Sequence, residues 1–333
     1  MPRTLAWGPP LVAAAALVLA AATPEPASAC SVCLAGDPVF DANGASVGEQ
    51  GQWNLFIQGS GWKKTSGALP HEEPAAGGEE EHSASEKNRS RRLDLYLGWT
   101  PLDRVTLTVN VPFAFNHITE IEAEDRQGFS LSGIGDVSLM GSVVLWRNRD
   151  VLPSTWLEGR AFVKAPTGNS NERVHGVQDP HLQPGTGSWD CGFGVAAAHQ
   201  LPLAALYAST SYRVNMEGSL DYEYGDTVLA NAAVLVPLEP ATGVPWLAPF
   251  STGAELNYRW AQRDLFHGGD YKDSGGSILY ATPSLRLALP ALAIGERLPP
   301  SLRFSVQIPL TNRWLHGEQE EHPLWRVGLV VPF

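Results

Sequence analysis

Cysteine is scarce in this chain, and basic residues are outnumbered by acidic ones. Three Cys among 333 residues cannot form the dense disulfide framework of a small secreted domain. The 23 Lys and Arg stand against 35 Asp and Glu, which gives a net charge of -12. No basic stripe is present that could release counterions from nucleic-acid phosphates. The composition therefore excludes a disulfide-built scaffold and argues against a nucleic-acid partner.

Long hydrophobic runs are also missing after the first thirty residues. Mean hydropathy is -0.11, and 26 Pro and 33 Gly would interrupt a long helix. The one apolar run, residues 11–22, follows a basic start and precedes a small-x-small tripeptide at 27–29. It is shorter than the roughly 20 residues that a spanning helix needs. We therefore expect residues 1–29 to be a cleavable signal peptide rather than a membrane anchor, with the mature chain beginning near Cys30.

Alternation of apolar and polar residues is what the chain has in abundance. Leu93, Leu95, Leu97 and Trp99 fall on one face of an extended segment, and polar or small residues fall on the other. A period of two is the pattern of a β-strand with two different faces. We expect about twelve such strands, near 52–62, 93–100, 105–115, 133–146, 155–165, 187–199, 204–215, 226–238, 247–260, 278–289, 301–311 and 323–333.

Alternation alone does not separate a soluble β-sandwich from a membrane barrel, in which the apolar face meets lipid. The lengths of the connections favour the barrel, because long polar segments alternate with short turns such as 101–104 and 200–204. Long external loops and tight periplasmic turns are typical of outer-membrane barrels. The long connections are expected at 63–92, 116–132, 166–186, 216–225, 261–277 and 312–322.

The length of the strands and the composition of the last one favour the same fold. Several segments reach ten or more residues, which suits a tilted strand that crosses hydrocarbon. We expect the final strand to carry the signal that the barrel-assembly machinery recognises, at Trp325, Val327, Leu329, Val331 and Phe333. The predicted fold is all-β, a transmembrane antiparallel up-and-down barrel over residues 52–333, preceded by a periplasmic or lumenal segment at 30–51.

Three motifs in the middle of the chain resemble those of a bacterial family. They are a Gly-x-Gly-Asp element, a Pro-Thr-Gly turn and a Gly-x-Gly-x-Trp-Asp element, at Gly133, Gly135 and Asp136; Pro166, Thr167 and Gly168; and Gly185, Gly187, Trp189 and Asp190. The stretch is similar to outer-membrane barrels assigned to the meta-pathway of phenol degradation, often called simply transporters. The resemblance covers about 70 residues and implies an outer-membrane channel for aromatic or other hydrophobic compounds.

Charged residues on the polar faces of the expected strands are candidates for setting selectivity. In a barrel these side chains face the lumen, where polar groups must find partners or water. Their mixed signs predict paired networks across the pore. The candidates are Glu158, Arg160, Lys164, Arg213, Glu255, Arg259 and Arg303.

Cys30 and Cys33 are separated by two residues at the expected start of the mature chain. They can close a disulfide in the oxidising periplasm, or bind a soft ion such as Cu(I) as thiolates. The sequence is also compatible with lipidation of Cys30 and with two free thiols. The spacing alone does not decide between these states, and the disulfide is the first expectation.

Histidines gather in the predicted long loops beside acidic residues, at His71, His82, His175, His181, His267, His316 and His322. Imidazole and carboxylate together suit Zn(II) or Cu(II), and loops over one mouth can bring ligands together. The competing interpretation is a set of solvated acidic loops without a site, since no tight ligand spacing occurs.

No nucleophile elbow, phosphate-binding loop or zinc-protease motif occurs in the sequence, so we do not expect an enzyme. We expect a channel or transporter in the Gram-negative outer membrane, with no required cofactor. Its partners would be membrane lipid, the barrel-assembly machinery and a small hydrophobic or aromatic solute. The alternative is a metal-binding outer-membrane protein that uses the His and acidic loops together with Cys30 and Cys33 to hold copper or zinc.

Overall fold

A computed structural model describes residues 50–67, 85–122, 125–149, 153–293, 298–317 and 319–333. The expected signal peptide and nearly all of the segment 30–51 lie outside the described residues, as do Cys30, Cys33, His71 and His82. Among the described residues, no helix is both long enough and apolar enough to cross a membrane.

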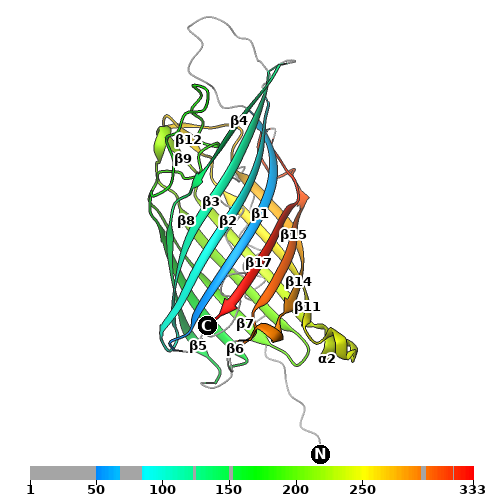
Figure 1. Cartoon of the computed structure of the whole chain (residues 1–333). Helices are drawn as coiled ribbons and strands as arrows, with labels where there is room; N and C mark the ends of the chain where they lie inside the picture. Colours follow the sequence, from blue (N-terminus) through cyan, green and yellow to red (C-terminus); the bar gives the residue numbers. More distant parts are fainter. Residues whose placement is uncertain (1–49, 68–84, 123–124, 150–152, 294–297, 318) are drawn as a thin grey trace, which may run out of the picture.

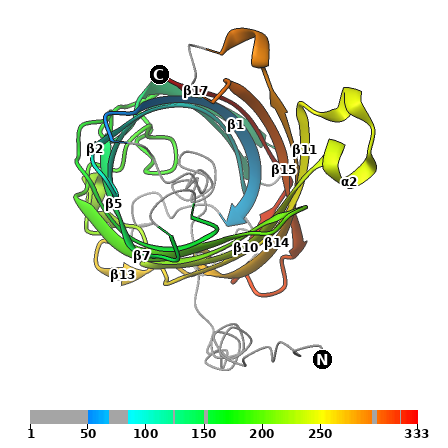
Figure 2. The same cartoon turned by 90° about the horizontal axis from the view of Figure 1, so that it is seen from below.

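Twelve antiparallel strands close into a barrel (Figures 1 and 2). Closure follows because β1 pairs with β2 on one side and with β17 on the other. The fourth strand of the barrel consists of two pieces, β4 and β5. In chain order the strands are β1 (Trp53–Gly67), β2 (Ser85–Leu102), β3 (Val105–Glu122), β4 (Asp125–Ile134), β5 (Ser138–Arg147), β6 (Thr155–Lys164), β7 (Asp190–Gln200), β8 (Ala205–Val214), β10 (Thr227–Pro237), β11 (Phe250–Ala261), β14 (Gly276–Ala288), β15 (Ser301–Thr311) and β17 (Leu324–Pro332).

Short secondary-structure elements lie at both ends of the barrel. At one end lie β16 (Glu320–Glu321) and a small sheet of β9 (Tyr222–Glu223), β12 (Leu265–Phe266) and β13 (Gly269–Asp270), preceded by η1 (Ser219–Asp221). Figure 1 shows α2 (Leu238–Thr242) at the opposite end, where the carboxyl terminus also lies. The short turns η2 (Pro245–Leu247) and η3 (Pro290–Leu292) follow β10 and β14.

The two faces of the wall are inverted relative to a soluble protein. On β2, Leu93, Leu95 and Leu97 are 41%, 42% and 41% exposed, whereas the alternating Asp94 is fully buried. The same alternation on the other strands leaves large apolar side chains on the outer surface. Such a surface is stable only against lipid, because apolar area exposed to water costs about 25 cal/mol per Å².

The predicted twelve-strand barrel is confirmed, including the alternation of long external connections with shorter periplasmic turns. Two connections on the periplasmic side are longer turns, residues 238–249 with α2 and η2, and residues 289–300 with η3.

The predicted boundaries of two external loops were wrong. Strands continue into both segments: residues 63–67 and 85–92 belong to β1 and β2, and residues 116–122 and 125–132 belong to β3 and β4. Beyond the membrane the outward faces of these strands carry polar residues, so the outward apolar alternation ends although backbone pairing continues. The predicted fourth strand, 133–146, in fact begins at Asp125 and is interrupted between Ile134 and Ser138.

Candidate functional site

A cavity of about 150 Å³ lies inside the barrel, lined by residues from β1 to β8 and by the connection 165–189. Aromatic side chains contribute to its wall, at Trp62, Tyr96 and Phe162. Four cationic side chains also reach it, namely Arg92, Arg160, Lys164 and Arg213. The site therefore combines flat apolar surfaces with positive charge.

Most of these cations are held by carboxylates on the same inner face. Arg92 lies 2.7 Å from Asp94, and Arg160 lies 2.8 Å from Glu158. Each pair spans two positions of one strand, which places both side chains on the same side of the sheet. The guanidinium carbon of Arg213 stacks 4.6 Å from the centre of the Phe162 ring, within the range of a cation–π contact.

The remaining predicted selectivity residues lie on other strands. Asn257 donates a hydrogen bond to Glu255 at 3.2 Å, and Arg259 forms a buried ion pair with Glu321 of β16. Arg303 of β15 is opposite Arg286 of β14. The structure thus divides the predicted set between the cavity and the rest of the inner wall, and a role for these residues in selectivity stays a prediction.

The three motifs found in the sequence meet at the break between β4 and β5. Asp136, which occupies the break, accepts hydrogen bonds from the backbone N–H of Gly168 at 2.9 Å and of Thr186 at 2.7 Å. Lys164 Nζ lies 3.2 Å from Asp136 and 2.6 Å from Asp190. Residues from all three motifs therefore form one polar junction that fixes the connection 165–189 to the wall.

Glycine is required at this junction because backbones approach closely. A Cβ on Gly168 would lie 2.5 Å from the carbonyl carbon of Gly135, and one on Gly185 would lie 2.7 Å from a carboxylate oxygen of Asp136. Both distances are shorter than any ordinary carbon contact. The motifs are therefore signatures of this packing as well as of turns.

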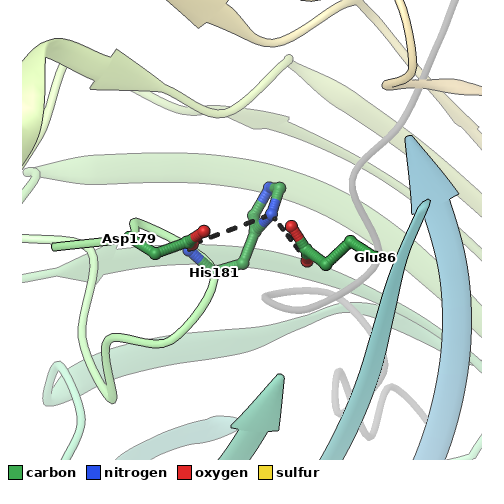
Figure 3. Close-up of side chains that lie close together, drawn as sticks. All are labelled: Glu86, Asp179 and His181. Carbon is green, nitrogen blue, oxygen red and sulfur yellow. Dashed lines mark hydrogen bonds and ion pairs between the residues drawn. The ribbon is translucent and has the colours of Figure 1, made fainter. Parts of the chain in front are cut away.

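Above the cavity, the same connection carries a buried acidic cluster (Figure 3). His181 Nδ1 lies 3.2 Å from Glu86 Oε1 of β2 and 4.0 Å from Asp179 Oδ1. Each of these three side chains is at most 2% exposed. Among the described residues, this is the one group of three metal-ligating side chains within ligand distance of one another.

The cluster continues through a tyrosine to a third carboxylate. His181 Nε2 lies 3.1 Å from the hydroxyl of Tyr222, which donates to Asp264 at 2.6 Å. Burial, together with the negative charge of Glu86, raises the pKa of Asp179 to about 6. Burial also raises the pKa of Asp264. Carboxylates are crowded here in a region with little water.

The other predicted metal ligands that the structure describes do not join this cluster. His175 is exposed, and His267 is exposed 3.3 Å from Asp221. His316 is partly buried beside Arg263, and burial and that positive charge lower its pKa. His322 is partly buried and donates its backbone N–H to Lys63.

Sequence reasoning found His181 but missed Glu86, Asp179, Tyr222 and Asp264. The residues at 86, 88 and 90 are buried polar side chains that alternate with exposed charged ones. Polar–charged alternation is a weaker signal than apolar–polar alternation, although it was present in the sequence.

Closed topology, a lipid-facing apolar surface and a polar lumen together define an outer-membrane β-barrel, and the expected location in the Gram-negative outer membrane is confirmed. Among solved structures, the chain is similar to an outer-membrane channel from Pseudomonas putida F1. The TM-score is 0.59 at 15% identity, over 86% of this chain and 96% of that chain. At this identity the likeness concerns the fold.

Two further solved structures are less similar. A mutant of the monoaromatic hydrocarbon channel TodX gives a TM-score of 0.45 at 8% identity, over 92% of this chain and 96% of that chain. The toluene transporter TbuX from Ralstonia pickettii gives 0.41 at 9% identity, over 86% and 90%. No protein-family model matches the chain, and no curated protein matches its sequence.

Proposed function

We propose that this protein is an outer-membrane channel for small hydrophobic or aromatic solutes. The observation that carries the proposal is the cavity inside the barrel, with aromatic side chains and arginines on its wall. The fold shared with a solved outer-membrane channel supports passage across the membrane as the general role.

The size of the cavity favours a single-ring solute. Its volume is about 150 Å³, and an apolar cavity of about 150 Å³ is large enough to hold benzene. Trp62, Tyr96 and Phe162 offer ring faces against which such a solute can stack. A larger or strongly hydrated solute would have to displace the paired charges on the wall.

The charged residues of the lumen are proposed to tune which small solutes pass. Arg160 and Arg213 reach the cavity next to Phe162, so an aromatic solute with a negative group would find a ring and a cation together. Glu255, Arg259 and Arg303 lie elsewhere on the inner wall, where they would act on the path beyond the cavity.

Assembly into the outer membrane is proposed to depend on β17. Trp325, Val327 and Leu329 pair with Gly61, Gly59 and Ile57 of β1, which closes the barrel. Trp325 and Val327 are 43% exposed on the lipid side. With Val331 and Phe333 they form the aromatic-ended strand that we propose as the signal for the assembly machinery.

Solute flux through the purified barrel in liposomes tests the channel proposal. The wild-type protein should increase the uptake of labelled benzoate and toluene above the rate of protein-free vesicles. Ala114 lines the cavity and is buried, so Ala114→Phe should fill it and reduce this flux at least tenfold.

Ala161→Phe is the matched control, because Ala161 is exposed on the outer face of β6. This variant should keep the wild-type flux. A wild-type barrel that passes neither solute, or an equal loss in both variants, would count against the proposal.

A further inference from the structure

We propose that Glu86, Asp179 and His181 form a binding site for one divalent transition-metal ion such as zinc, which fastens the connection 165–189 to β2. Figure 3 shows the two carboxylates approaching His181 from opposite sides, Glu86 from the barrel wall and Asp179 from the connection. The inference concerns a site above the cavity and does not depend on which solute the channel carries.

The donor set has the chemistry and nearly the spacing of a zinc site. Imidazole nitrogen and carboxylate oxygen bind zinc at about 2.0–2.2 Å, so that donors of a tetrahedral site lie roughly 3.3 Å apart. The atoms of Glu86 and His181 are 3.2 Å apart, and those of Asp179 and His181 are 4.0 Å apart. All the ligand atoms lie within 4.8 Å of one another. Shortening the distance between Asp179 and His181 from 4.0 Å to about 3.3 Å would give this pair the spacing of zinc ligands.

Asp179 provides an independent indication of a missing partner. Its Oδ1 accepts a hydrogen bond from the backbone N–H of His181 at 2.6 Å. Its Oδ2 is buried and has no hydrogen-bond partner. A carboxylate oxygen without a partner inside a protein is costly, because it loses hydration without a replacement. A bound cation would satisfy it.

The hydrogen bonds of the imidazole leave the correct nitrogen for a metal. Tyr222 donates its O–H to Asp264, so the tyrosine oxygen accepts from His181 Nε2. The proton of a neutral imidazole therefore lies on Nε2, and Nδ1 presents a lone pair to two carboxylates. Two kinds of acceptor then face each other, and either a proton or a bound metal ion between them removes this conflict. A hydrogen-bond acceptor behind a metal-binding histidine, here the Tyr222 hydroxyl, is a common feature of metal sites.

The local charge also favours a cation. Glu86, Asp179 and Asp264 are three carboxylates that are at most 2% exposed around one imidazole. Lys64, which is 2% exposed, stabilises the charged form of Asp264. A divalent ion at His181 would neutralise the negative charge that remains.

Binding there would affect the cavity through the connection itself. Asp179 and His181 precede Gln183, Pro184 and Gly185, which line the cavity. Asn116 of β3 holds the same segment by donating to the carbonyl oxygens of Leu182 and Gln183, at 3.1 and 3.0 Å. An ion at the cluster would add a second attachment between this segment and the wall.

Zinc titration of the full-length barrel in detergent tests the site after treatment with EDTA. Equilibrium dialysis with elemental analysis should find one more zinc per barrel in the wild type than in His181→Asn or Asp179→Asn. Affinity at that site should fall at least 100-fold in both variants. Tyr222→Phe should weaken it about 10–100-fold, the usual effect of losing the group behind a ligand.

His175→Asn is the matched control, because His175 is an exposed histidine of the same connection. Its backbone has a positive φ of 51°, which Asn tolerates. This variant should bind zinc as the wild type does. Equal zinc binding by wild type, His181→Asn and Asp179→Asn would overturn the proposal, and so would an equal loss in His175→Asn.

Limited proteolysis gives a second measurement that does not depend on the variants alone. Arg173 is an exposed tryptic site in the connection. Zinc should slow cleavage there at least tenfold in the wild type, and magnesium should not. Cleavage at the same rate with and without zinc would contradict a fastening role, and protection by magnesium would contradict selection of a transition metal. If His181→Asn fails to fold, Glu86→Gln takes its place in both measurements.

Discussion

The two halves of β2 differ on one face and agree on the other. From residue 93 to residue 99 its outward side chains are Leu and Trp, whereas its outward side chains nearer the external end are exposed cations, at Lys87, Arg89 and Arg91. Its inward side chains are buried in both halves, at Glu86, Asn88, Ser90, Asp94 and Tyr96. The outer edge of the membrane therefore lies between Arg91 and Leu93.

Neighbouring strands repeat the change at the positions that pair with β2. Arg89 pairs in register with Lys63 of β1 and with His117 of β3, and all three are exposed. The comparison teaches that apolar alternation marks the membrane-spanning part of a strand, whereas the strand itself extends as far as its backbone finds partners.

The largest expected loss of stability comes from the inward face of the membrane-spanning part of the wall, at Lys164 of β6. Lys164→Met would leave Asp136 and Asp190 buried without their shared cation, and their side chains are only 3% and 4% exposed. Removing one partner of a buried ion pair costs about 3–5 kcal/mol. Guanidinium chloride titration of the barrel refolded in lipid vesicles should show this loss. Lys164→Arg keeps the charge and should lose much less, and equal losses would contradict the pairing argument.

Exchanging leucine and a charged residue on the outward face of β2 should affect stability differently in its spanning part and in its external part. Leu95→Arg places a cation near the middle of the lipid layer, which costs about 2–4 kcal/mol in a barrel. Arg89→Leu, at an exposed position of the same strand beyond the membrane, should change the free energy of unfolding by no more than about 0.5 kcal/mol. Similar changes in the free energy of unfolding of the two variants, measured by the same titration, would contradict a membrane edge between Arg91 and Leu93.

Much of the wall followed from the sequence because the spanning segments alternate strictly. Strands such as β6 and β15 begin and end within a residue or two of their predicted limits. The extensions of β1 to β4 were missed, since their outward residues are polar and give no apolar period. The break between β4 and β5 was missed because it depends on Gly135 and Asp136 meeting a connection some thirty to fifty residues further along the chain.

The candidate sites were harder to predict than the wall. The lumen-facing charges at Arg160 and Lys164 followed from strand period alone. The grouping of His181 with Glu86 joins positions 95 residues apart, and no local pattern indicates which of nine histidines will meet a carboxylate. Long-range packing of the connection 165–189 determines that choice.

The smallest expected effect is at the periplasmic edge of the spanning half. Trp53 and Trp99 stack on the outer face of β1 and β2, with ring centres 5.5 Å apart and planes 17° from parallel. Such aromatic pairs contribute about 0.5–1.5 kcal/mol beyond their burial. A double-mutant cycle with Trp53→Leu and Trp99→Leu should give a coupling energy in that range. Either single variant already removes the stacking contact, so the double variant loses less than the sum of the two. If the coupling energy is zero, the stacking argument is wrong. The two tryptophans would then stabilise the barrel independently, each as a separate anchor in the lipid headgroups.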